Sequence, residues 1–223
     1  READPEDTLL FSRVSERLIP KNFEAILLSA RLLEDLERFE LANETYSLVP
    51  EDHPSSHVAE LGRADTLVRA EKQDAAIEVL MKLAKKRPDL PIVFSDLGDI
   101  YRGQEEFAKA VDAYDKAIAL YDIPSPAQWY VFYSRAVSYE RQDIWVKAEA
   151  DFRKALELFP DQPQVLNYLG YSLVEKQIKL DEALSMIERA VKMRPDDGFI
   201  TDSLAWVLYR LGRYDEAIVH LER

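Results

Sequence analysis

Residues 91–119 read PIVFSDLGDIYRGQEEFAKAVDAYDKAIA, and this stretch decides the fold. In residues 94–101, apolar or small side chains recur three and four positions apart, which is the spacing of one face of an α-helix. Residues 107–118 repeat this spacing, and Gly103 between the two segments predicts the end of the first helix. The stretch therefore predicts a pair of helices joined by a short turn.

Three series of residues repeat along the chain with a period of about 34 residues, which is the length of one repeated helix pair. Small residues of the first helices form the first series: Ala30, Ala64, Gly98, Ala136, Gly170 and Ala205. Small residues of the second helices form the second series: Ala42, Ala76, Ala110, Ala148, Ala183 and Ala217. Large residues of the second helices form the third series: Tyr46, Leu80, Tyr114, Phe152, Ile187 and Leu221. Because helices approach to about 8–10 Å where small residues face each other, the first two series predict tightly packed pairs.

This periodicity predicts an all-α fold, a right-handed superhelix of about six helix pairs in which each pair contacts its neighbours. The predicted pairs are residues 23–56, 57–90, 91–128, 129–162, 163–197 and 198–223. Residues 1–22 are predicted to form an N-terminal helix that ends at Pro20 and is the remnant of a preceding repeat. The last pair is predicted to be incomplete, with an apolar end that nothing in this chain covers.

The spacing between the third and fourth pairs is longer than elsewhere, and residues 121–126 fill the difference. Ser125 is predicted to cap a helix whose first residue is Pro126, since proline is favoured at that position. We expect a longer helix or a local loop at this point, and not a domain break.

The composition favours a folded protein and argues against several classes of function. Hydrophobic residues make up 47% of the chain, yet no apolar run approaches the roughly 18 residues that a transmembrane helix needs. A net charge of −13 disfavours nucleic acid as a partner, because a phosphate backbone would be repelled. The chain has no cysteine, and Pro54 between His53 and His57 disfavours a metal site there. We predict no catalytic residue, no cofactor and no metal, so the chain is not expected to be an enzyme.

With these series in view, the chain resembles the tetratricopeptide repeat (TPR) family. The family pattern places an aromatic residue or Leu, then Leu-Gly and Tyr in the first helix, with Ala and an aromatic residue in the second. The third pair carries Phe94, Leu97, Gly98, Tyr101, Ala110, Tyr114 and Ala117. Ser29, Arg63 and Arg135 depart from the pattern, since Leu is usual at their positions. The resemblance implies a scaffold that binds a protein or peptide.

The C-terminal repeats are similar, more narrowly, to exported bacterial TPR proteins that are often lipid-anchored at the outer membrane. Residues 166–173, 194–198 and 202–210 carry this resemblance. It implies a periplasmic or outer-membrane-associated lipoprotein that acts as an adaptor for a protease or a cell-wall enzyme. A cytoplasmic location is the alternative, and the cysteine that would bear the lipid is not in this chain.

In TPR arrays the first helices line a concave groove, and in the C-terminal half of this chain the projecting residues there are mostly aromatic. The predicted partner-binding residues are Tyr130, Tyr133, Asn167, Tyr171, Phe199, Trp206 and Tyr209. Such rings give a large contact area at low entropic cost, and the Asn amide can bond a peptide backbone. The alternative is that some of these rings pack between helices as additional core. The corresponding N-terminal positions are mixed, and Asp65 and Asp99 are among them.

Three functions remain open on the sequence. The first is a protein or peptide-binding scaffold that uses this groove. The second is a structural module that forms homo-oligomers through its uncovered C-terminal end. The third is a helical domain attached to an enzyme whose catalytic part lies outside this chain.

Overall fold

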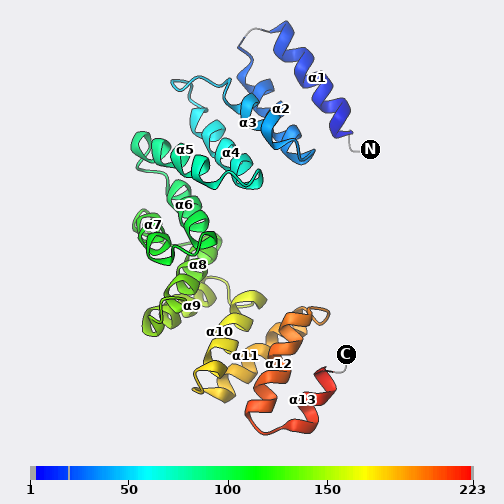
Figure 1. Ribbon diagram of the computed structural model, residues 1–223, viewed down its shortest axis with the longest axis vertical. Helices are drawn as coiled ribbons and strands as arrows, with labels where there is room; N and C mark the ends of the chain where they lie inside the picture. Colours follow the sequence, from blue (N-terminus) through cyan, green and yellow to red (C-terminus); the bar gives the residue numbers. More distant parts are fainter. Residues whose placement is uncertain (1–3, 20, 222–223) are drawn as a thin grey trace. The chain divides into compact units, whose positions relative to one another are not determined.

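The computed structural model describes residues 4–19 and 21–221, so Pro20, the predicted end of the first helix, lies outside the described residues. Within these ranges the chain is built from α-helices and one short 3-10 helix, with no strand, which confirms the all-α prediction (Figure 1). The helices of the first half are α1 (Pro5–Leu18), α2 (Phe23–Asp35), α3 (Phe39–Tyr46), α4 (Ser56–Arg69), α5 (Gln73–Lys86), α6 (Pro91–Gly103) and α7 (Phe107–Ala119). Those of the second half are η1 (Pro126–Gln128), α8 (Trp129–Glu140), α9 (Trp145–Leu158), α10 (Pro163–Glu175), α11 (Leu180–Met193), α12 (Gly198–Arg210) and α13 (Tyr214–Leu221).

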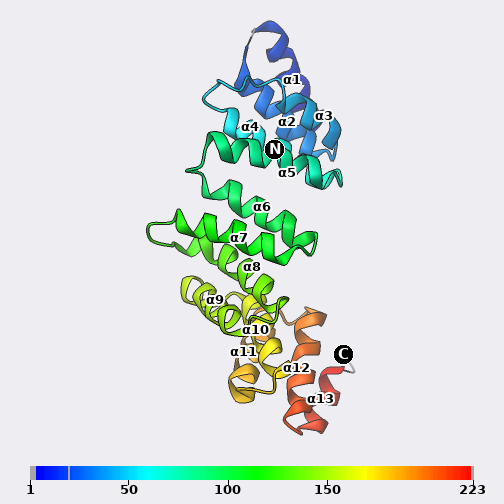
Figure 2. The ribbon, with the colours of Figure 1, turned by 60° about the vertical axis from the view of Figure 1, so that its left-hand side comes forward.

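The helices after α1 pack as pairs of neighbours in the chain: α2 with α3, α4 with α5, α6 with α7, α8 with α9, α10 with α11, and α12 with α13. The two helices of each pair lie side by side in both views (Figure 2). We call the earlier helix of a pair its first helix and the later one its second helix. This is the arrangement that the apolar spacing of residues 94–101 and 107–118 predicts.

Contacts divide the chain into two compact units, Arg1–Tyr121 (unit 1) and Asp122–Arg223 (unit 2). This division differs from the expectation of an uninterrupted array. Pro124 and Pro126 lack a backbone N–H and so cannot extend α7 as a regular helix. As predicted, Ser125 precedes a helical turn that begins with Pro126, and the Ser125 backbone N–H donates to the Gln128 side chain.

The three repeated series form the cores of the pairs. Every alanine of the two small-residue series is at most 4% exposed. At Gly98 the first helix lies so close to the second that an added Cβ would stand 2.5 Å from the Tyr114 ring. At Gly170 such an atom would stand 2.7 Å from Ile187. Small residues are therefore needed where a large side chain of the second helix packs onto the first.

The turn inside each pair has one conformation that recurs. The residue at the turn adopts a left-handed backbone conformation in every pair, at Glu37, Glu71, Glu105, Asp143, Gln177 and Gly212. The residue after it donates its backbone N–H to a carbonyl five residues earlier, for example Lys72 to Leu67 at 2.8 Å. This is the Schellman motif, which usually has glycine at the left-handed position. Gly103 is the last residue of α6, as predicted, and the left-handed residue of that turn is Glu105.

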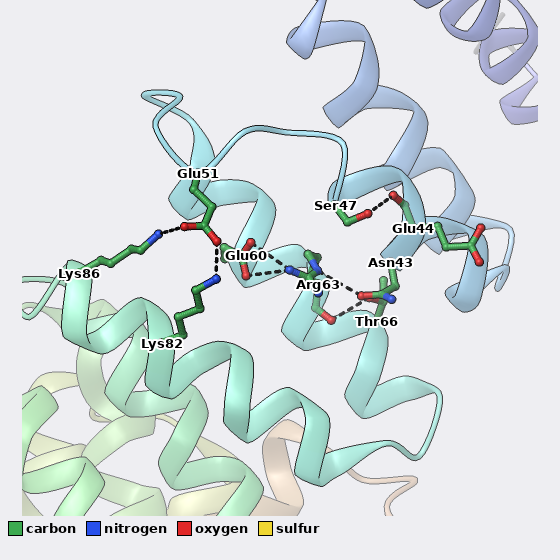
Figure 3. A network of polar contacts seen from close by, with 9 residues as sticks. All are labelled: Asn43, Glu44, Ser47, Glu51, Glu60, Arg63, Thr66, Lys82 and Lys86. Carbon is green, nitrogen blue, oxygen red and sulfur yellow. Dashed lines mark hydrogen bonds and ion pairs between the residues drawn. The ribbon is translucent and has the colours of Figure 1, made fainter.

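Polar residues at three positions where the family pattern has Leu make specific contacts. Ser29 Oγ donates to Ser12 Oγ at 2.8 Å, and Ser12 Oγ donates to the Ala25 carbonyl at 2.8 Å, so buried hydroxyls join α1 to α2. Arg63 donates to both carboxylate oxygens of Glu60 at 3.1 Å (Figure 3).

The third of these residues, Arg135, forms a two-pronged ion pair with Asp151 across the α8–α9 pair. Its Nε lies 2.7 Å from Asp151 Oδ2 and its Nη2 lies 2.8 Å from Oδ1. The guanidinium also lies 5.8 Å from the ring centroids of Phe132 and Tyr139. The departures from the pattern thus place hydrogen-bonded polar groups where Leu is usual, and the buried Ser29 in particular requires such a partner.

The left-handed turns generate a first testable prediction. Glu71→Gly should raise the free energy of unfolding by about 0.5 kcal/mol. Glycine relieves about 1–2 kcal/mol of strain in the left-handed conformation, but it loses more backbone entropy on folding, which offsets part of this gain. The same change at Glu78, in the middle of α5, should lower the free energy of unfolding by about 1 kcal/mol. Urea denaturation of both variants measures the two effects. If both substitutions changed the free energy of unfolding in the same direction, this explanation of the turn would be contradicted.

Candidate functional site

The predicted partner-binding residues lie on α8, α10 and α12, the first helices of the three pairs in unit 2. Four of these side chains are exposed: Tyr130 at 36%, Tyr171 at 44%, Phe199 at 87% and Tyr209 at 52%. Trp206 is partly exposed. The structure thus places large aromatic side chains at the surface of all three first helices.

The side chain of Trp206 is held by contacts on several sides. Its indole Nε1 donates to Glu175 Oε1 at 2.7 Å, and the Arg210 guanidinium lies 5.4 Å from its ring centroid. Its ring stacks on Tyr209 with centroids 5.5 Å apart and planes inclined by 14°. Since these contacts fix the ring before any partner arrives, a partner meets an ordered surface.

A cavity of about 370 Å³ lies beside these rings, between α12 and α13. Its walls are almost wholly apolar and come from Ala205, Trp206, Tyr209, Tyr214, Ile218 and Leu221. Tyr214 was absent from the predicted set, although its ring centroid lies 5.3 Å from that of Tyr209. The sequence does contain a signal for Tyr214. It stands three residues before Ala217 of the second small-residue series, and the equivalent residues of two other pairs are the aromatic Phe107 and Trp145.

The prediction that Tyr133 faces the groove is wrong. Its side chain is only 7% exposed, and its ring centroid lies 6.0 Å from Phe152 and 5.9 Å from Tyr168. The Gln164 side-chain amide donates to its hydroxyl at 3.2 Å. Phe152 on α9 and Tyr168 on α10 both fill the space beside α8, so Tyr133 joins the core between neighbouring pairs. This is the alternative that the sequence left open.

Asn167 on α10 is only partly exposed, and its Oδ1 is buried without a hydrogen-bond partner among the described residues. A buried acceptor that makes no bond costs about 1–3 kcal/mol. This oxygen is therefore unpaired but enclosed by the protein, and only the rest of the side chain is partly exposed.

Unit 1 has a cavity of a different character at its own first helices. It measures about 300 Å³ between α4, α5 and α6, and three carboxylates, Asp65, Asp96 and Asp99, contribute to its lining. Burial, reinforced by the negative charges of Asp99 and Asp65, raises the pKa of Asp96 from the ordinary 3.8 to about 7. The sequence indicated Asp65 and Asp99 but not Asp96, because burial cannot be read from helical spacing alone.

Two further properties concern metals and membranes. Across residues 4–19 and 21–221, no group of three or more His, Asp and Glu side chains is placed to hold a metal ion. His53 instead packs against Phe23, with ring centroids 4.5 Å apart. None of the helices in the described part of the chain is long and apolar enough to cross a membrane.

The raised pKa of Asp96 generates a second prediction. A carboxyl group whose pKa is higher in the folded state stabilises the fold when protonated, so the free energy of unfolding should fall as the pH rises from about 4 to about 7. Asp96→Asn should remove about 1–3 kcal/mol of this fall, whereas Asp35→Asn, at an exposed position, should not. Chemical denaturation at pH 5 and pH 8 measures it. An unchanged pH dependence in Asp96→Asn would disprove the assignment.

Comparison with known proteins agrees with the repeat pattern. The TPR repeat-containing protein PA4667 of Pseudomonas aeruginosa is 29% identical over 166 residues, which are 74% of this chain and 28% of that protein. The human protein O-mannosyl-transferase TMTC1 is 26% identical over 168 residues, which are 75% of this chain and 19% of that protein. The chain thus spans less than a third of the length of these curated relatives.

Among solved structures, that of Pseudomonas aeruginosa PilF matches with a TM-score of 0.76 at 17% identity, over 88% of this chain and 87% of that one. At this identity the likeness shows the fold alone. A family model described as tetratricopeptide repeat matches residues 95–163 and 164–223, which together are more than half of the chain. The resemblance stated from the sequence is therefore confirmed, and the chain belongs to the tetratricopeptide repeat family.

Proposed function

We propose that this chain is a non-catalytic scaffold that binds a protein or peptide segment at the first helices of unit 2. The observation that carries the proposal is the apolar cavity between α12 and α13, together with the stacked rings of Trp206 and Tyr209 that form part of its wall. TPR arrays are protein-interaction scaffolds, and their extended surfaces are the usual binding sites.

The chemistry of this site favours an apolar side chain of the partner inside the cavity. Burial of apolar surface contributes about 25 cal/mol for each Å² removed from water. On the first helices of the same unit, Tyr171 and Phe199 offer further exposed rings, and Asn167 is partly exposed. Aromatic anchors with a polar surround are typical of the residues that dominate binding energy.

A second candidate function is self-association through the C-terminal pair. Leu221 is 65% exposed, whereas the other five members of its series are at most 3% exposed. Ile218 and Val219 are exposed beside it on α13. A second copy of the chain that covered this surface would bury Leu221, whose equivalents the other pairs bury.

Two finer roles rest on similarity alone. We propose a periplasmic or outer-membrane-associated location, and an adaptor role for a protease or cell-wall enzyme, from the resemblance of residues 166–173, 194–198 and 202–210 to exported bacterial TPR proteins. The match to TMTC1, named as a transferase, supports the alternative that this domain is attached to an enzyme in a longer protein.

The third prediction tests the aromatic site in cells. A photo-crosslinking amino acid at Tyr171 should capture a protein partner that the same probe at Lys192 on α11 does not capture. Trp206→Ala should weaken binding of that partner by about 2 kcal/mol, because the ring is an ordered anchor. Trp145→Ala, which removes an equal side chain from a second helix, should leave binding unchanged.

Cross-linking with mass spectrometry, followed by titration of the captured partner, provides the measurement. Equal capture from both probe positions, or no effect of Trp206→Ala on a variant that circular dichroism shows to be folded, would contradict the proposal. Capture of the chain by itself, with a mass in light scattering that rises with concentration, would favour self-association.

A further inference from the structure

A second cavity of unit 1, of about 340 Å³, is lined by residues of the second helices α5 and α7 and of the first helix α6. Its apolar walls come from Met81 on α5 and from Phe94, Leu97 and Tyr101 on α6. Met81 is exposed although it is apolar, so the pocket offers apolar surface to solvent. Its volume is near the lower end of the range of about 300–1,000 Å³ for ligand pockets, enough for one bulky side chain.

The rim of this pocket carries the charge opposite to that of the chain as a whole. Lys85 on α5 and Lys109 and Lys116 on α7 line it, with Asp112 as the acidic residue of the lining. The chain has a net charge of −13, with 42 acidic residues against 29 Lys and Arg. Three ammonium groups around an apolar pocket therefore form a local positive site on an acidic protein.

Two of these lysines have no polar partner among the residues that the structure describes, namely Lys85 and Lys116. Their neighbours on α5 differ: Lys82 and Lys86 both contact the Glu51 carboxylate (Figure 3). Lys109 pairs with Glu106 and lies 5.5 Å from the Tyr101 ring centroid. Lys82 and Lys86 thus join α5 to the loop between α3 and α4, whereas Lys85 lines the pocket.

The equivalent place in unit 2 is closed by an ion pair. Arg153 on α9 donates to both carboxylate oxygens of Glu182 on α11, at 2.8 and 3.1 Å. Arg153 follows Phe152 of the large-residue series, and Glu182 precedes Ala183 of the second small-residue series. The residues at these two positions in unit 1 are Met81 and Lys109, which cannot form such a bridge. The second helices α5 and α7 of unit 1 therefore have no such bridge across the pocket.

We propose that this lysine-rimmed pocket binds an acidic peptide segment of a partner protein, with a bulky apolar side chain in the cavity and carboxylates on either side of it. Because Lys85 stands on α5 and Lys116 on α7, the positive charges flank the cavity on two sides. A peptide with acidic residues before and after its apolar residue can pair with both, whereas a fatty acid has one carboxylate at the end of its chain. Charge complementarity of this kind gives specificity and a faster association rate.

This inference is independent of the aromatic site in unit 2, since no residue is shared. The probe is a blocked peptide of sequence Gly-Ser-Asp-Glu-Phe-Asp-Glu-Ser-Gly, titrated into the full 223-residue chain and followed by two-dimensional amide NMR and calorimetry. Saturable shifts confined to α5, α6 and α7 are expected. Peptides with Ser for Phe, or with Lys for every Asp and Glu, are expected to give no such shifts.

Variants of the chain sharpen the test. Lys85→Glu combined with Lys116→Glu should weaken binding of the peptide by about tenfold or more, since two attractions become repulsions. Ala84→Phe, which fills the pocket without a change of charge, should abolish binding. Lys192→Glu on α11, a single charge reversal away from the pocket, is the charge control and should leave the affinity unchanged, whereas Lys85→Glu alone should weaken binding. Trp206→Ala should also leave the affinity unchanged, and thermal melting tests whether each variant is folded.

Several results would overturn the proposal. These are an absence of saturable shifts in α5–α7, an affinity that survives both charge reversals, or shifts that Ala84→Phe leaves in place. Displacement of the peptide by dodecanoate, with the same dependence on Lys85 and Lys116 and a higher affinity, would assign the pocket to an anionic lipid instead. If Trp206→Ala abolished binding of the peptide and the pocket variants did not, the peptide would be assigned to the aromatic site of unit 2.

Discussion

The close contact between a small residue on one helix and a large side chain on its partner is the constraint on which the rest of this structure depends. At Gly98 and Gly170 an added Cβ would collide with Tyr114 or Ile187, so the helices can approach only because those positions are nearly empty. This distance fixes how the two helices of a pair pack. The remaining residues of each helix are then free to serve as surface, and their chemistry decides what the protein can bind.

The fold was accessible from the sequence because this constraint repeats. One helical period is weak evidence, but Ala30, Ala64 and Gly98 recur 34 residues apart, and a repeated helix pair accounts for all three. The left-handed turns were not predicted, since Glu71 and Asp143 occupy positions where glycine is the usual signal. The division near Asp122 was also missed, because spacing within repeats carries no information about contacts between them.

The candidate site was predictable only in part, because helical spacing gives the face of a helix but not what covers it. Tyr133 has the spacing of a groove residue, yet Phe152 and Tyr168 enclose it. Tyr214 was missed since it lies on a second helix and meets Tyr209 only after the pair has folded. The pocket beside Lys85 depends on residues of three helices, and the absence there of a bridge like that of Arg153 is visible only when the repeats are compared in space.

The position of the aromatic site at the last pair has a consequence for dynamics. In a repeat protein each pair is stabilised by its neighbours, so backbone amides of an outer pair exchange with solvent through local opening more readily than those of inner pairs. Within unit 2, α13 contacts α12, whereas α11 contacts both α10 and α12. A partner seated between α12 and α13 would add contacts to both helices, so its binding should be detectable as slower amide exchange in α13.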